Sequence, residues 1–177
     1  MNFRVWDIPV RLGHWFLLLS VSAAWFTRHG FGSIHEWLGY FALALVLTRV
    51  VWGFVGSKFA RFSQFVTSPS RTIAYARTLI SGKSIRYLGH NPLGGWMTLV
   101  LLSLVFLVCA SGWLYTTDRF WGVEWVETMH RILTNILLVF IGLHITGVIY
   151  SSIKGRENLV MSMIHGNKCS PTGDDIQ

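Results

Sequence analysis

Four long segments of this chain carry few charged residues, and they constrain its fold more than any other feature. They cover residues 9–27, 35–55, 93–115 and 129–153. A helix that crosses the hydrocarbon core of a membrane needs about 20 mostly apolar residues, because its backbone must satisfy all its hydrogen bonds internally. We therefore predict an all-α integral membrane protein whose single domain, residues 1–177, is a four-helix bundle.

Composition excludes the main alternatives. Hydrophobic residues make up 52% of the chain and charged residues 13%, about half of the roughly 25% charged residues usual in soluble domains. A soluble domain of 177 residues cannot bury so much apolar surface, and a disordered chain is not so apolar. Two cysteines exclude a disulfide scaffold, and the absence of a C-x-x-C-H motif excludes covalent c-type haem attachment.

The first apolar segment has a second interpretation, a signal peptide. Arg4 and Arg11 precede a short apolar core, and the small residues Ala23 and Ala24 lie near its end. No polar exported domain follows, because the chain continues directly into another apolar segment. A membrane-spanning helix is therefore the preferred interpretation.

The basic residues, which give a net charge of +7, lie mostly on one side of the predicted spans. The connection 56–92 has six basic and no acidic residues, whereas segments 28–36 and 116–131 together have three basic and four acidic residues. The positive-inside rule then places both termini and the loop 56–92 in the cytoplasm. The charge thus indicates anionic lipid rather than nucleic acid. Residues 69–80 are expected to form an amphipathic helix at the membrane surface, and residues 170–177 a flexible tail.

Four histidines fall inside or at the ends of the predicted spans, where ionisable residues usually mark a functional site. His130 and His144 are 14 residues apart, about 21 Å and close to four helical turns, so both lie on one face of the fourth span. The antiparallel order of the spans then predicts an outer pair, His35 and His130. It also predicts an inner pair, His14 and His144.

Facing imidazoles without a nearby thiolate or carboxylate suit a b-type haem better than the tetrahedral sites that zinc prefers. We therefore expect two non-covalent bis-histidine haems b. Gly39 and Gly142 would allow close approach of the porphyrins, and Arg49, 14 residues after His35, would pair with a propionate of the inner haem. The alternatives are small-residue helix packing for the glycines and an arginine that reaches the headgroups.

Three stretches of sequence resemble the prokaryotic cytochrome b561 family, whose relatives include the b-type cytochrome subunits of nickel-iron hydrogenases. The stretches are RVWDIPVRLGHW, HEWLGYFALALVLTRVVWGFVGSKFARFSQFV and YLGHNPLGGWM, and the resemblance covers roughly residues 3–155. It implies a dihaem bundle in the bacterial inner membrane that exchanges electrons with quinone, with its histidine ligands at His14, His35, His130 and His144. Hydrogenase subunits often have an additional span, which this chain lacks.

The leading functional hypothesis is electron transfer between the quinone pool and a periplasmic redox protein, such as a c-type cytochrome or an oxidoreductase subunit. A quinone site needs an apolar slot with a few polar groups. The candidates on the inner side are His90, Asn91, Arg11, Asp7, Trp15 and Trp96. Helix capping is the alternative role for His90 and Asn91.

Two other functions stay open. One is a stand-alone superoxide:quinone oxidoreductase, which the acidic outer segments disfavour because superoxide is an anion. The other is a non-redox membrane protein, which would have to explain four histidines at matched depths. No catalytic acid, base or nucleophile stands out. The sequence fixes neither the direction of electron flow nor the quinone type, and it is compatible with a homodimer.

Overall fold

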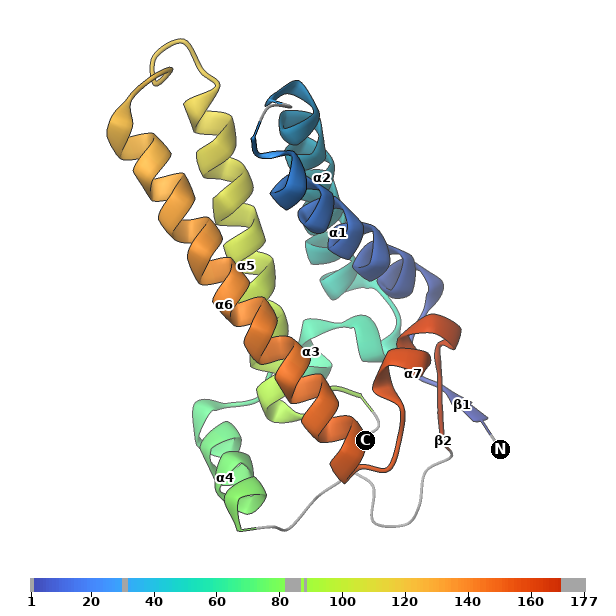
Figure 1. Cartoon of the computed structure of the whole chain (residues 1–177). Coiled ribbons are helices and arrows are strands. Elements are labelled where there is room, and N and C mark those ends of the chain that lie inside the picture. The colour runs from blue at the N-terminus through green and yellow to red at the C-terminus, as the bar shows by residue number, and fades with distance from the viewer. Residues whose placement is uncertain (1, 30–31, 82–86, 88, 170–177) are drawn as a thin grey trace. The chain divides into compact units, whose positions relative to one another are not determined.

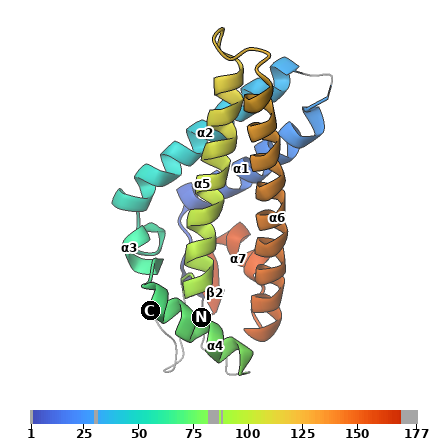
Figure 2. The ribbon, with the colours of Figure 1, turned by 90° about the vertical axis from the view of Figure 1, so that its left-hand side faces the viewer.

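A computed structural model describes residues 2–29, 32–81, 87 and 89–169 of the chain. The predicted tail 170–177 lies outside these residues. The elements, shown in Figures 1 and 2, are β1 (Asn2–Arg4), α1 (Ile8–Thr27), α2 (Gly32–Val55), the 3-10 helix η1 (Lys58–Ala60), α3 (Phe62–Phe65), α4 (Pro69–Ile80), α5 (Pro92–Tyr115), α6 (Glu124–Lys154), α7 (Leu159–His165) and β2 (Asn167–Cys169).

The four longest helices coincide with the four predicted apolar segments. Helix α6 begins five residues before the predicted start at Met129. Its first turn contains Glu124 and Glu127, and negative charge near a helix N-terminus is stabilised by the helix dipole. Glu124 and Glu127, which were predicted to lie in the segment between two spans, are therefore part of the helix. The helix predicted over 69–80 is confirmed as α4, and its position at the membrane surface stays a prediction.

Among the described residues, three helices are long and apolar enough to cross a membrane: α2, α5 and α6. Helix α1 is long enough, with 20 residues, but it is not among the helices that are apolar enough to cross a membrane. Its first half contains the polar residues Arg11 and His14. The structure thus confirms a helical membrane protein, whereas a count of four spans stays a prediction.

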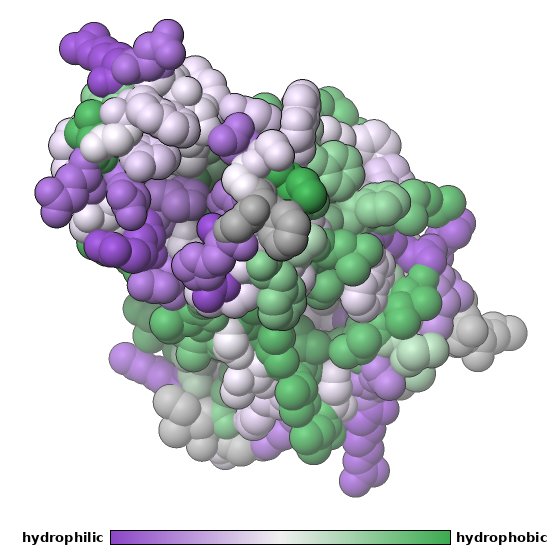
Figure 3. All heavy atoms as spheres, turned by 45° about the horizontal axis from the view of Figure 1, so that its top comes forward, coloured by the Kyte–Doolittle hydropathy of each residue, from purple (hydrophilic) through white to green (hydrophobic). Residues whose placement is uncertain are grey.

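Large apolar side chains on the spanning helices are exposed rather than buried. Examples are Trp37 on α2, with 73% of its surface exposed, and Ile153 on α6, with 74%. Figure 3 shows apolar side chains at the surface on the side in view. Helices that are apolar on all sides are typical of proteins surrounded by lipid, so we interpret these side chains as lipid-facing.

The chain divides into two compact units. One consists of residues 12–50 and 100–141, and therefore contains parts of all four long helices. The other consists of residues 1–11, 51–99 and 142–177, so that the two terminal segments and the long connection belong to the same unit. The side of the membrane on which these three segments lie stays a prediction.

The terminal segments pair with each other in the second unit. β1 and β2 form an antiparallel two-stranded sheet, with Phe3 opposite Lys168, and the amides of Val5 and Trp6 donate to the Gly166 carbonyl at 2.9 and 3.0 Å. Gly166 ends α7 with a φ of 85°, a conformation that favours glycine. The all-α prediction missed this small sheet, because segments of three residues give too little pattern to detect.

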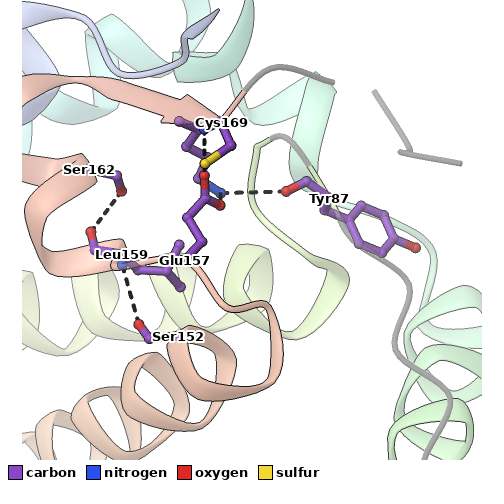
Figure 4. A network of polar contacts seen from close by, with 7 residues as sticks. Tyr87, Ser152, Glu157, Leu159, Ser162 and Cys169 are labelled. Carbon is purple, nitrogen blue, oxygen red and sulfur yellow. Dashed lines mark hydrogen bonds and ion pairs between the residues drawn. The ribbon is translucent and has the colours of Figure 1, made fainter. Parts of the chain in front are cut away.

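A network of polar contacts holds β2 in place (Figure 4). Lys168 is buried, and its Nζ lies 3.9 Å from Glu157 Oε2 and 3.5 Å from the carbonyl oxygen of Tyr87. Glu157 Oε1 accepts a hydrogen bond of 2.8 Å from the amide of Cys169. A buried cation needs such partners to offset its lost hydration, and these partners tie the C-terminal strand to the long connection.

Asp7 fixes the start of α1. Its Oδ1 accepts from the amide of Val10 at 3.0 Å, an N-cap interaction. Its Oδ2 accepts from Trp52 Nε1 at 2.9 Å and from Ser57 Oγ at 2.6 Å. Burial raises the pKa of Asp7 and is the largest single influence, but the hydrogen bonds together outweigh it, so that the net pKa lies below the usual value. One carboxylate therefore joins the N-terminal segment to the last turn of α2 and to Ser57, which follows it.

Replacing Asp7 by Ala should lower the stability of the purified protein by about 1–3 kcal/mol, because it removes the cap and leaves two donors without an acceptor. Asp7→Asn should cost less, because an amide oxygen still caps a helix. A thermal melt in detergent measures both, with the exposed Asp118→Ala as control. Equal melting temperatures for all variants would contradict this role.

The same carboxylate predicts a pH dependence. Because the folded-state pKa of Asp7 is lowered, its contribution is fully present above the ordinary carboxyl pKa of about 4 and is lost as the pH falls through the lower folded-state value. The difference in melting temperature between the wild type and Asp7→Asn should therefore shrink only at strongly acidic pH.

Candidate functional site

His35 and His130, the predicted outer pair, lie close together in the unit formed by residues 12–50 and 100–141. His35 lies in the first turn of α2 and His130 in the second turn of α6. Their ring centres are 6.2 Å apart, and the ring planes are inclined at 85°. The structure thus brings together two residues that are 95 positions apart in the sequence.

Both rings are anchored through the same nitrogen. His35 Nδ1 lies 2.9 Å from the carbonyl oxygen of Ala24 on α1. His130 Nδ1 lies 3.1 Å from the carbonyl oxygen of Val108 and 3.0 Å from Ser111 Oγ, both on α5. A carbonyl oxygen only accepts, so each Nδ1 carries the hydrogen. Each Nε2 is then the nitrogen with a lone pair for a metal.

This geometry fits a bis-histidine haem. Two imidazoles that bind one metal ion from opposite sides, with metal–nitrogen bonds of about 2 Å, have ring centres about 6 Å apart. A hydrogen bond from Nδ1–H to a carbonyl is also the usual outer partner of a metal-bound histidine. Within the described residues, no three His, Cys, Asp or Glu side chains come together as a metal site. The donor set at this position is a pair of neutral imidazoles.

The glycines near this pair differ in their surroundings. A Cβ added to Gly39, one turn after His35 on α2, would meet nothing within 4 Å. A Cβ on Gly112 of α5 would lie 3.2 Å from His130 Cε1, tighter than an ordinary contact. Gly39 therefore borders open space, and its role beside a haem stays a prediction, whereas Gly112 makes room for the histidine itself.

The two histidines of the predicted inner pair fall in different units, so each is described separately. His14 lies on α1, half-buried, with its ring centre 5.5 Å from that of Trp15 and the two ring planes perpendicular. His144 lies on α6 and is also half-buried, and Gly142 nearby has nothing within 4 Å of an added Cβ. Arg49 lies half-buried on α2. Their pairing and the propionate role of Arg49 stay predictions.

A pocket of about 470 Å³ lies in the other unit, beside His90. Its aromatic walls include Phe59, Phe65 and Tyr75, and Arg71 adds a charge. The ring centre of His90 is 4.6 Å from that of Phe65. The full set of lining residues is Phe59, Gln64, Phe65, Thr67, Arg71, Ala74, Tyr75, Thr78, Tyr87, Gly89, His90 and Pro92. Small-molecule sites are commonly of this size and character.

The other predicted quinone residues have structural partners. Asn91 Oδ1 accepts from the amide of Gly94 at 2.7 Å and so caps α5. Arg11 donates to the carbonyl of Ile164, and Trp96 Nε1 donates to the carbonyl of Thr67 at 3.2 Å. Asp7 caps α1 as described above. Of the six candidates, His90 is the one that lines the pocket.

Comparison with known proteins assigns the family. The sequence profile described as prokaryotic cytochrome b561 matches residues 5–166, which include every element from α1 to α7. The chain belongs to the prokaryotic cytochrome b561 family. A family of b-type cytochromes implies haem b, membrane helices and electron transport, in agreement with the paired imidazoles. No solved structure is significantly similar to the chain.

Its relatives include proteins named probable Ni/Fe-hydrogenase B-type cytochrome subunit. That of Cupriavidus necator is 26% identical over 210 aligned positions, which cover 92% of this chain and 85% of the relative. That of Rhizobium leguminosarum bv. viciae is 23% identical, with 97% and 90% covered. In the first alignment, 92% of 177 residues is about 163, so about 47 of the 210 positions have no counterpart in this chain.

The sequence did not predict the groups that accept hydrogen bonds from His35 and His130. The carbonyl oxygens of Ala24 and Val108 leave no trace in a sequence, because every residue has a carbonyl. Ser111 and Gly112 had a weak signal, since a buried polar residue next to a glycine is uncommon in an apolar helix such as α5. The aromatic residues of the connection 56–92 that line the pocket were also not singled out.

Replacing either His130 or His35 by Ala should remove one bis-imidazole site, and the haem content per chain should fall by one. The pyridine haemochrome assay on purified protein measures this ratio. His29→Ala is the matched control, because His29 is exposed and follows the end of α1. An unchanged haem content in both variants would exclude the outer pair as ligands.

Proposed function

We propose that this protein transfers electrons across the bacterial inner membrane through two bis-histidine haems b. The electrons pass between the quinone pool and a redox protein at the outer, periplasmic face. In this proposal α1, α2, α5 and α6 all span the membrane, and both termini are cytoplasmic. His35 and His130 bind the outer haem, and His14 and His144 bind the inner haem.

The observation that carries the proposal is the outer pair. Its ring separation of 6.2 Å would allow both imidazoles to hold one haem iron, and both Nδ1 atoms are held by carbonyl oxygens. Haem b, when bound, supplies reversible one-electron chemistry, and two histidine ligands leave no position for oxygen. The residues themselves keep the ligands aligned and exclude water. His144 lies 14 residues after His130 in the same continuous helix, which supports a second site at another depth.

The pocket beside His90 supports a quinone site. Its aromatic walls suit an apolar ring, and His90, Tyr75 and Tyr87 offer polar atoms for the quinone oxygens. Burial raises the pKa of Tyr75, with further contributions from Tyr87 and Tyr150, and burial also raises that of Tyr87. Both phenols therefore stay protonated at neutral pH and can donate a hydrogen bond to a carbonyl oxygen.

The surface charges near the outer pair support a basic periplasmic partner. The segments 28–36 and 116–131 contain four acidic and three basic residues, all exposed. One of the basic residues, Arg28, stacks its guanidinium 3.6 Å above the Trp25 ring. Complementary charge guides docking between redox proteins. A basic c-type cytochrome fits this surface, whereas an anion such as superoxide is not attracted to it.

The relatives named as hydrogenase cytochrome subunits suggest an oxidoreductase subunit as the other class of partner. However, about 47 aligned positions of the Cupriavidus necator relative are absent here, and about 20 residues suffice for one additional span. The matched region of this chain is therefore shorter than that of the Cupriavidus necator relative. We therefore propose a c-type cytochrome as the first candidate for the redox partner and a hydrogenase as the second.

The purified protein tests the function directly. It should contain two haems b per chain, and a quinol should reduce both without added enzyme. Oxidised c-type cytochrome should then reoxidise them, more slowly as the ionic strength rises, because salt screens the charges that guide docking. A protein without haem would exclude the redox function. A fast reduction of quinone by superoxide would favour the stand-alone oxidase instead.

Replacing His90 by Leu should slow the reduction of haem by quinol at least about tenfold, because a polar contact to the substrate is lost at a buried site. The haem spectrum should not change, since His90 is not a haem ligand in this proposal. Stopped-flow absorbance measures the rate, with the exposed His165→Leu as control. A normal rate in His90→Leu would remove the pocket from the quinone site.

A further inference from the structure

Ser111 gives the outer pair an asymmetry that the ligand pattern does not reveal. His35 is held by the carbonyl of Ala24. His130 is held by the carbonyl of Val108 and, in addition, by the side chain of Ser111. Ser111 is buried, with 4% of its surface exposed, and a buried hydroxyl in an apolar helix is expensive unless it is hydrogen-bonded.

The direction of the Ser111–His130 bond follows from the third contact in this cluster. Ser111 Oγ donates its one hydrogen to the Val108 carbonyl at 2.9 Å. Its lone pairs then remain as acceptors, so the bond of 3.0 Å to His130 Nδ1 is donated by the histidine. Ser111 Oγ and the Val108 carbonyl thus converge on a single N–H.

Gly112 completes this arrangement. A Cβ at this position would lie 3.2 Å from His130 Cε1 and 3.5 Å from Nδ1, so the ring lies against the glycine backbone of α5. The consecutive residues Ser111 and Gly112 therefore act on one edge of the same imidazole, the serine by hydrogen bonding and the glycine by leaving room.

We propose that Ser111 is a positioning residue that lowers the reduction potential of the outer haem through His130. This inference rests on the proposed function, because it needs iron at the outer pair. An acceptor on Nδ1–H makes an imidazole a more basic ligand, and a more basic ligand favours ferric over ferrous iron. The extra acceptor on His130 thus stabilises the oxidised outer haem.

The test is a spectroscopic redox titration of the purified holoprotein with Ser111→Ala. The oxidation equilibrium of one haem should shift about tenfold toward the reduced form, which is about 59 mV for one electron. The other haem should be unchanged. The matched control is Ser20→Ala, because Ser20 on α1 is equally buried, with 3% exposed, and makes the same bond to a carbonyl three residues earlier, that of Leu17.

Two further variants separate hydrogen bonding from packing. Ser111→Thr keeps the hydroxyl, so its outer haem should have the wild-type reduction potential. If Ser111→Ala no longer binds the outer haem, Ser111→Thr should still bind it. Gly112→Ala should change the electron paramagnetic resonance signal of the same ferric haem, because it displaces the ring, whereas Gly32→Ala, with nothing within 4 Å, should not.

The possible outcomes distinguish the two proposals. If the wild type lacks haem, the proposed function fails. If both haems are present and Ser111→Ala titrates like Ser20→Ala, the function stands and the role of Ser111 is wrong. The role is also wrong if Ser111→Thr behaves like Ser111→Ala, or if the potential of the affected haem falls instead of rising.

Discussion

The contact between the imidazoles of His35 and His130 is the interaction on which the functional interpretation depends. A neutral imidazole inside a membrane protein loses its water and must find a partner for each nitrogen. Here the Nδ1 atoms bind carbonyl oxygens of neighbouring helices. Each ring is then fixed in one tautomer and one orientation, with Nε2 left for a metal. The 6.2 Å between the ring centres gives the space that one iron ion requires.

The carbonyl oxygens that anchor the rings come from helix backbones, which links the site to the packing of the helices. Val108 lies on α5 three residues before Ser111, and a serine hydroxyl commonly bonds a carbonyl of the preceding turn. The same carbonyl thus serves the serine and the histidine. A small shift of α5 along α6 would break the bonds from His130 to the Val108 carbonyl and to Ser111 Oγ, whereas the Ser111–Val108 bond lies within α5. The relative position of these two helices is therefore a determinant of the chemistry proposed for the outer haem.

Charged side chains stabilise the second unit, which consists of residues 1–11, 51–99 and 142–177. The buried Lys168 and the carboxylate of Asp7 hold the two terminal segments to the residues around η1 and the long connection. This polar unit includes the pocket beside His90. A quinone in this pocket would therefore bind to short helices and loops of the unit that these charged groups hold together.

The sequence by itself indicated where the long apolar helices lie, because the length of an apolar segment is a local property. It also singled out four histidines as candidate ligands, because the 14-residue spacing along one helix is local too. It also indicated the surface helix α4, and its resemblance to the b561 family was confirmed. Only the tertiary structure revealed which backbone carbonyls hold His35 and His130, the pairing of β1 with β2, and the partners of Asp7. These contacts join residues far apart in the chain through backbone atoms or single polar groups, for which side-chain periodicity carries no information.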